Sequence, residues 1–175
     1  LLATEVAHDH AALVRHAVTT KAGRYVQGGG CATVGVAGLI TGGGFGSFSK
    51  HYGMAAAGLL EAEVVTADGA VRIANACTHP DLFWALKGAG GGSFGVVTRL
   101  TMRMREIPEF FGGVLGTIQA TSDAAFRRLI ARFTAFYAEA LFNPGWGESV
   151  YFRPDNTLVL GMVFHGLAQA EAAAV

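Results

Sequence analysis

The stretch that decides the fold covers residues 28–46 and reads GGGCATVGVAGLITGGGFG. It combines many glycines with a single cysteine, Cys31, and it contains no charged residue. Glycine permits positive φ and allows a flat or anionic ligand to lie directly against the main chain. In an ordinary strand or helix so many glycines would be costly, because each one adds chain entropy that folding must remove. The stretch therefore predicts a ligand site lined by backbone amides, with one thiol within reach of the ligand.

The composition is that of a packed globular protein. Of the 175 residues, 51% are hydrophobic and 15% are charged, which excludes a disordered chain. The formal net charge of zero argues against a nucleic-acid partner, which normally requires a basic face. Glycine or charge interrupts every apolar run well before the roughly 18 residues of a membrane span, so we expect no membrane partner. Both ends of the sequence resemble cuts, and we expect a piece of a longer protein.

Periodicity predicts a set of short elements up to about residue 106. Helical spacing covers residues 4–18, and a strand pattern covers residues 60–66. Asp68 and Gly69 predict a tight turn, followed by a return strand over residues 71–73. A short helix is expected over residues 81–87, with Pro80 at its start. Residues 96–104 alternate, which predicts a strand with Thr98, Leu100, Met102 and Met104 on one face.

A change of pattern at residues 106–109 predicts a domain boundary. After it, a strand is expected over residues 114–119, and Ser122 or Asp123 should cap a helix. Two further strands are expected over residues 148–152 and 157–164, on either side of a turn. The helix carries an apolar stripe that we interpret as core: Phe126, Leu129, Ile130, Phe133, Phe136, Tyr137 and Leu141.

Two familiar glycine motifs are present but stand in the wrong context. Residues 90–95 satisfy the G-x-G-x-x-G dinucleotide pattern, and residues 91–95 satisfy the G-x-S-x-G nucleophile pattern around Ser93. Both patterns require a strand before them and a helix after them, whereas here the order is reversed. The histidines form no pair of clusters at metal-ligand spacing, so we expect no metal site. Cys77 has no distinguishing context and is interpreted as a structural or surface thiol.

Two longer motifs resemble those of the berberine-bridge-enzyme-like FAD-linked oxidases, within the vanillyl-alcohol-oxidase group with a PCMH-type FAD-binding domain. The first motif combines residues 24–38, 42–46 and 50–53. The second covers residues 81–97 and reads DLFWALKGAGGGSFGVV. The resemblance implies an α+β fold. Residues 1–106 would form the C-terminal part of the FAD-binding domain, and residues 107–175 the beginning of an antiparallel-sheet substrate domain.

The resemblance also implies roles for individual residues. Cys31 would form a thioether to C6 of the flavin ring, although without the motif it would be interpreted as a small buried hydrophobe. Val34 falls where a small residue leaves oxygen access to the flavin, which favours an oxidase over a dehydrogenase. The residues expected to bind FAD are Cys31, Thr33, Val34, Gly35, Gly38, Gly42, Gly43, Gly44, Phe45, Val96 and Val97.

The family's flavin-linked histidine would lie before residue 1 and its catalytic base after residue 175, so no catalytic residue is assigned. The intact protein is expected to oxidise an alcohol, a sugar or a secondary metabolite by hydride transfer to covalently bound FAD, with O2 as acceptor. The chain alone is expected to retain little FAD and to be inactive. One alternative is a non-catalytic or truncated family member that binds a ligand or a partner. A further alternative is a nucleotide-binding enzyme that uses the second glycine cluster.

Overall fold

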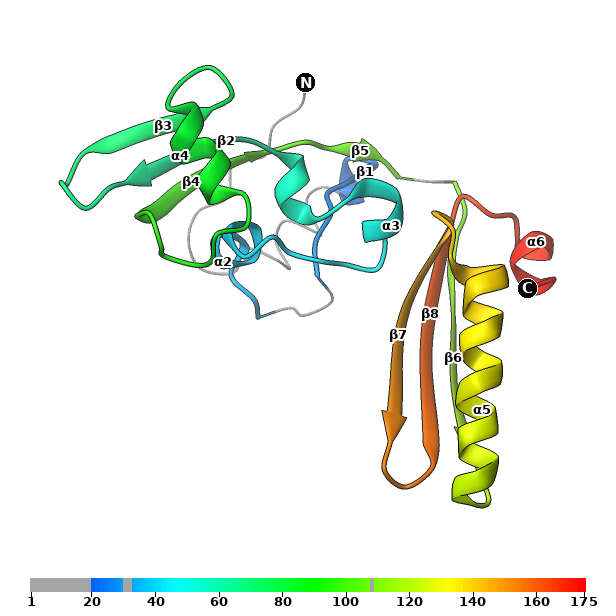
Figure 1. The fold of residues 1–175 in the computed structure, drawn as a ribbon. Helices are drawn as coiled ribbons and strands as arrows, with labels where there is room; N and C mark the ends of the chain where they lie inside the picture. Colours follow the sequence, from blue (N-terminus) through cyan, green and yellow to red (C-terminus); the bar gives the residue numbers. More distant parts are fainter. Residues whose placement is uncertain (1–19, 30–32, 108) are drawn as a thin grey trace. The chain divides into compact units, whose positions relative to one another are not determined.

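A computed structural model describes residues 20–29, 33–107 and 109–175, which belong to two compact units, Leu1–Ile107 and Pro108–Val175 (Figure 1). The helix expected over residues 4–18 and the thiol of Cys31 lie outside the described residues. The functional assignment of residues 1–106 and 107–175 stays a prediction.

The first unit is built on an antiparallel three-stranded sheet in the order β3-β2-β4. Its strands are β2 (Leu59–Val65), β3 (Val71–Asn75) and β4 (Val96–Met102). The predicted turn between β2 and β3 is confirmed. Gly69 has φ 78° and its N–H donates to the carbonyl oxygen of Thr66 at 2.9 Å.

The alternation expected along β4 is wrong at Thr98. Glu63 of β2 pairs with Arg99 and Val64 pairs with Val97, so that Thr98 is an extra residue in the ladder. Such a bulge resets the alternation of side chains between the two faces. Val97 is therefore buried in place of Thr98, whose hydroxyl donates to a carboxylate oxygen of Glu63 at 2.7 Å.

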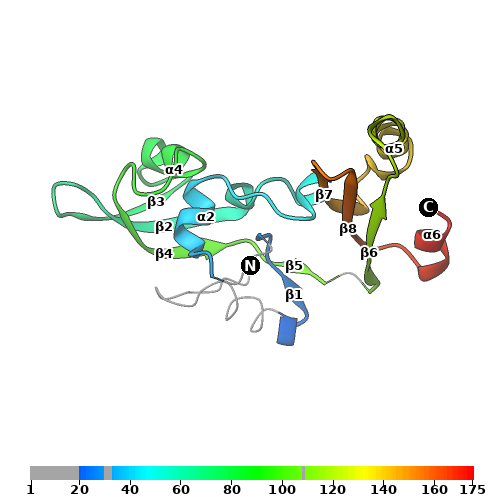
Figure 2. The same cartoon turned by 90° about the horizontal axis from the view of Figure 1, so that it is seen from below.

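Short helices and a small second sheet complete the first unit (Figure 2). The helical segments are α2 (Val36–Thr41), α3 (Ser49–Tyr52), η1 (Ala55–Gly58) and α4 (Pro80–Leu86), and the second sheet pairs β1 (Arg24–Tyr25) with β5 (Arg105–Glu106). Part of the glycine-rich stretch is thus helical, which the cost of glycine in helices argued against. The helix is anchored by Val36 and Ile40, one turn apart, which join a buried cluster with Val97 and Leu100.

The second unit is an antiparallel sheet in the order β6-β8-β7 with a helix packed on one face (Figures 1 and 2). Its elements are β6 (Phe111–Gln119), α5 (Asp123–Phe136), a π-helical turn η2 (Tyr137–Leu141), β7 (Trp146–Arg153), β8 (Thr157–His165) and α6 (Gln169–Ala173). The predicted cap is confirmed, since the Ser122 hydroxyl accepts from the N–H of Ala125 at 3.3 Å. Phe126 and Phe133 of α5 pack edge-on against Phe152 of β7.

The apolar stripe on α5 is only half-buried in this unit, and only Leu141 of the expected core residues is fully buried. A single layer of helix on a three-stranded sheet covers each aromatic ring from one side, which explains the difference. The α+β prediction is confirmed by both units. Within the described ranges, no helix has the length and apolar character needed to cross a membrane.

Candidate functional site

The two glycine-rich motifs lie against each other in the first unit. The N–H of Gly90 donates to the carbonyl oxygen of Thr41, the last residue of α2, at 2.8 Å. A Cβ placed on Gly88 would lie 3.9 Å from the Cα atom of Gly43. The residues following α2 and those preceding β4 therefore form one continuous backbone surface.

Three glycines after α2, Gly43, Gly44 and Gly46, are required by the chain's own structure. Gly43 and Gly44 have φ of 90° and 64°, a region in which residues with a Cβ are strained. A Cβ on Gly44 would also lie 2.8 Å from the carbonyl oxygen of Leu39. On Gly46 it would lie 1.9 Å from the carbonyl oxygen of Gly28, whereas Gly42 has an ordinary φ of −83° and a less severe contact of 3.0 Å with the carbonyl oxygen of Gly38. The fold alone therefore explains Gly43, Gly44 and Gly46 without a ligand.

Gly35 and Gly38 are different, because nothing in the described part of the chain requires them to be glycine. Gly35 precedes α2 with φ −64° and ψ 132°, which any residue adopts, and Gly38 lies inside the helix. A Cβ on either residue would have no described neighbour within 4 Å. Gly38 nevertheless costs the helix about 1 kcal/mol relative to alanine.

The two glycines are separated by three positions, so they lie on the same side of the α2 segment. Both are exposed, whereas Val36 and Ile40 are buried in the core. A strip of bare backbone on the outer side of a helix is a surface on which a flat ring can lie closer than any side chain would allow.

The remaining residues of the predicted site fall into two groups. Thr33, Val34 and Phe45 are exposed around the ends of α2, and Phe45 retains 77% of its accessible surface. On β4 the adjacent valines differ, because Val96 is 61% exposed whereas Val97 is 9% exposed and belongs to the core. Val97 can therefore offer a ligand only its backbone, whereas Val96 can offer its side chain.

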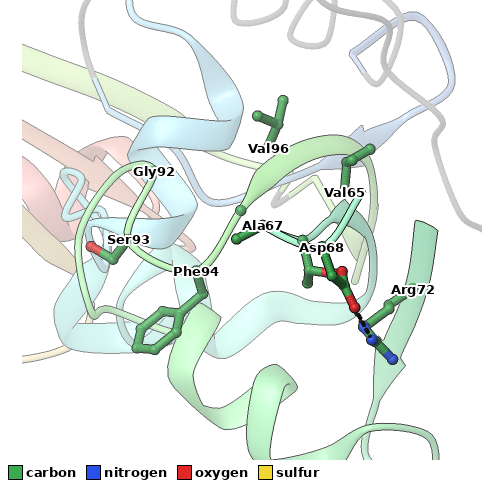
Figure 3. A pocket seen from close by; sticks show the side chains of 10 residues that line it. Val65, Ala67, Asp68, Arg72, Gly92, Ser93, Phe94 and Val96 are labelled. Carbon is green, nitrogen blue, oxygen red and sulfur yellow. Dashed lines mark hydrogen bonds and ion pairs between the residues drawn. The ribbon is translucent and has the colours of Figure 1, made fainter. Parts of the chain in front are cut away.

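An open cavity of about 730 Å³ lies beside Val96 (Figure 3). It is bounded by the end of β2 and the following turn on one side and by the second glycine-rich segment on the other. Its lining residues are Val65, Thr66, Ala67, Asp68, Arg72, Gly92, Ser93, Phe94, Gly95 and Val96. The cavity thus adjoins the predicted FAD contact on β4.

The charge at the edge of this cavity is held as an ion pair. The Asp68 carboxylate accepts hydrogen bonds from the Thr66 hydroxyl at 2.5 Å, from the N–H of Ala70 at 3.1 Å and from the Arg72 guanidinium at 2.6 Å. These donors, the Thr66 hydroxyl first, hold the pKa of the Asp68 carboxyl well below its usual value. The Asp68 carboxylate therefore stays ionised, and its hydrogen bonds are taken up by residues of its own turn. It is a poor candidate for a general base.

Gln27 lies within the first of the two family motifs, residues 24–38, but the resemblance implied no role for it, and the structure shows that it is a buried polar residue. Only 7% of its surface is exposed, and its carboxamide bonds to Tyr25, Ser49 and Gly53. The motif marks this position, but the partners Ser49 and Gly53 lie 22 and 26 positions away in the sequence, so a local pattern could not predict the role of the side chain.

The remaining metal-ligating, thiol and phenol side chains that the structure describes form no further candidate site. Among the described residues, no three His, Cys, Asp or Glu side chains gather as metal ligands would. Cys77 is exposed as a free thiol, which confirms one of the two sequence interpretations. Burial raises the pKa of the Tyr137 hydroxyl, and the nearby Glu148 carboxylate raises it further, so the phenol stays protonated at neutral pH.

Comparison with known proteins places these features in a family. Residues 10–75 match the model of an FAD binding domain. The FAD-linked oxidoreductase easE of Trichophyton verrucosum is 39% identical over 164 residues, which is 91% of this chain and 27% of the relative.

Solved structures agree with the sequence match. The VAO-type flavoprotein MtVAO615 of Myceliophthora thermophila is 31% identical with a TM-score of 0.81, covering 98% of this chain and 31% of that one. A berberine bridge enzyme variant described as a reticuline dehydrogenase is 26% identical with a TM-score of 0.81, covering 98% of this chain and 34% of that one. The chain spans about a quarter to a third of the length of these proteins. It belongs to the FAD-linked oxidoreductases of the vanillyl-alcohol-oxidase and berberine-bridge-enzyme family, whose fold contains a PCMH-type FAD-binding domain.

Proposed function

We propose that the full-length protein is an FAD-dependent oxidase that acts on a small alcohol, a sugar or a secondary metabolite. The observation that carries the proposal is the bare backbone at Gly35 and Gly38. These two glycines have no conformational or steric cause in the described chain, and the family's cofactor contains a flat ring that needs such a surface. The residues present therefore fit FAD.

When bound, FAD would supply the redox chemistry: the substrate would give up a hydride and a proton, and two electrons and two protons would pass to O2 to give hydrogen peroxide. The chain contributes the surface on which the ring is held. Gly35 and Gly38 would allow the ring to lie against α2, and Cys31 would hold it through a thioether. Val96, with its exposed side chain, and the backbone of Val97 provide apolar and hydrogen-bonding contacts at the start of β4.

The choice of an oxidase over a dehydrogenase rests on Val34. This side chain is 41% exposed directly before Gly35, so it would lie at the margin of the bound ring. Valine is one of the smaller apolar side chains, and we expect a small side chain at this position to leave O2 a path to the ring. A relative from Thermothelomyces thermophilus is described as a flavoprotein oxidase and a berberine bridge enzyme variant as a dehydrogenase, so the family includes both reactions.

The proposal is tested with the full-length protein. It should purify yellow, and acid precipitation should leave the colour on the polypeptide. Oxidation of a panel of alcohols and sugars should consume O2 and release hydrogen peroxide. A protein that neither contains flavin nor binds added FAD would contradict the proposal and support a different ligand-binding role.

The thioether has a matched control in this chain. Cys31→Ala should release the flavin on acid precipitation, or weaken its retention if a second covalent bond exists, whereas Cys77→Ala should change neither. Cys77 is exposed and far from the site in sequence, so it reports the effect of losing any thiol. An unchanged covalent flavin spectrum in Cys31→Ala would rule out the thioether.

A further inference from the structure

We infer that Gln27 is a positioning residue for the flavin, because its side chain locks together the two ends of the glycine-rich stretch. The inference rests on the proposed function, in which this stretch forms one wall of the FAD site. It concerns a residue outside every contact assigned to the cofactor above.

The two ends of the stretch are in direct contact. A Cβ on Gly46 would lie 1.9 Å from the carbonyl oxygen of Gly28, so the two backbones touch. The contact continues at the next pair of residues, because a Cβ on Gly29, which follows Gly28, would lie 3.6 Å from the carbonyl oxygen of Phe45, which precedes Gly46. The segment between them, including α2, is therefore a closed loop whose neck is formed by Gly28 and Gly46.

Gln27 fastens this neck through Ser49. The Gln27 amide Nε2 donates to the Ser49 hydroxyl at 3.0 Å, and the same hydroxyl accepts from the N–H of Gly46 at 2.9 Å. One side chain before the loop is thus connected to the last residue of the loop through a single oxygen atom. Glycine at both positions of the neck leaves no side chain that could do this instead.

The rest of the carboxamide is held equally firmly. Its Oε1 accepts from the Tyr25 hydroxyl, and Nε2 also reaches the carbonyl oxygen of Gly53 at 3.3 Å. Tyr25 in turn lies edge-on to the buried ring of Phe48, with 6.1 Å between ring centroids. A buried and fully bonded amide has one orientation, because any other leaves polar groups without partners.

The consequence for the cofactor is geometric. A planar ring that lies directly against backbone atoms is sensitive to small displacements of that backbone. No flexible side chain lies between the ring and the backbone to compensate for such a displacement. Loss of the Gln27–Ser49–Gly46 connection should let the neck open and misplace the strip at Gly35 and Gly38. We expect weaker FAD binding and an altered environment of the ring, with the fold retained.

The test uses the full-length protein in a Cys31→Ala background, so that FAD binds without the proposed thioether. Apoprotein is titrated with FAD, and the visible circular dichroism of the bound flavin is recorded. Ser49→Ala should weaken FAD binding about tenfold, the loss expected from one or two buried hydrogen bonds, and should change the flavin dichroism. Ser47→Ala changes an exposed serine two positions before Ser49, and it should change neither.

A second pair of variants isolates the hydroxyl from the shape of the side chain. Ser49→Thr keeps the oxygen and Ser49→Val removes it, while the two side chains have the same outline. Thr should restore the dichroism and Val should not. Equal FAD binding and equal dichroism in these two variants would overturn the positioning role. Absence of FAD binding already in the Cys31→Ala background and in the unsubstituted protein would instead overturn the proposed function.

Discussion

Gly44 lies so close to Leu39 that a Cβ on it would be 2.8 Å from the Leu39 carbonyl oxygen and 2.9 Å from Cγ of the same residue. The glycine also has φ 64°. The loop that follows α2 thus folds back on the helix, and this close return requires glycine regardless of any ligand. Gly38, six positions earlier, has no such restriction. The same stretch therefore contains glycines that stabilise the fold and glycines that do not.

The first prediction concerns the structural glycines. Gly44→Ala should lower the free energy of unfolding by about 3 kcal/mol, because it combines a left-handed backbone conformation with overpacking. Gly95→Ala should act in the same way, since Gly95 has φ 145° and its Cβ would lie 2.4 Å from the Val65 carbonyl oxygen. Urea unfolding measures both. Unfolding midpoints equal to that of the unsubstituted protein would show that these loops are not packed as described.

The second prediction concerns the start of α5. Ser122→Ala removes the acceptor for the N–H of Ala125 and should destabilise the second unit by about 1 kcal/mol. Ser122→Asp should restore most of the loss, because aspartate is an equally good capping residue. Thermal unfolding followed by circular dichroism checks both variants. Equal thermal stability of the Ser122→Ala and Ser122→Asp proteins would argue against the cap.

The third prediction concerns acid stability. The Thr66 hydroxyl, the Ala70 amide and the Arg72 guanidinium keep the pKa of Asp68 low in the folded state. The stabilisation is fully present above the unfolded pKa of about 3.9 and is lost as the pH falls toward the lowered folded value. Titration of the Asp68 carboxyl by NMR should give a pKa well below the ordinary value of an aspartate.

Arg72→Gln serves as the control for this titration. The change removes the guanidinium but keeps a side chain at the site, so the pKa of Asp68 should rise while the hydrogen bonds from Thr66 and Ala70 remain. An Asp68 carboxyl that titrates at its ordinary pKa in the unsubstituted protein would contradict the described turn.

Much of the fold could be predicted because its signals are local. The hairpin of β2 and β3 follows from alternation on both sides of Asp68 and Gly69, and α5 follows from a cap and a helical apolar period. The bulge at Thr98 could not be predicted, since one extra residue in a ladder is visible only when the partner strand is known. Helix α2 was missed because two turns are formed mainly by tertiary burial of Val36 and Ile40, against the glycine content.

The two glycine-rich segments of the candidate site could be predicted from the sequence. The stretch and the segment before β4 were identified from glycine content, and the bond between Gly90 and Thr41 brings them together. The sequence could not separate the glycines that permit a ligand from those that permit a turn, because this depends on φ and on neighbours distant in the chain. The network around Gln27 is non-local for the same reason.

The most direct test of the central claim is FAD binding by Gly38→Ala in the full-length protein, made in the Cys31→Ala background so that FAD binds without the proposed thioether. The substitution adds a methyl group to exposed helix backbone, so the stability of the apoprotein should be unchanged or up to about 1 kcal/mol higher. Gly116→Ala on β6, where a Cβ also has no described neighbour, is the matched control and should keep its FAD. The account predicts that Gly38→Ala loses about tenfold in FAD affinity or content while remaining folded. A folded Gly38→Ala protein with the full FAD content and an unchanged flavin spectrum would contradict it.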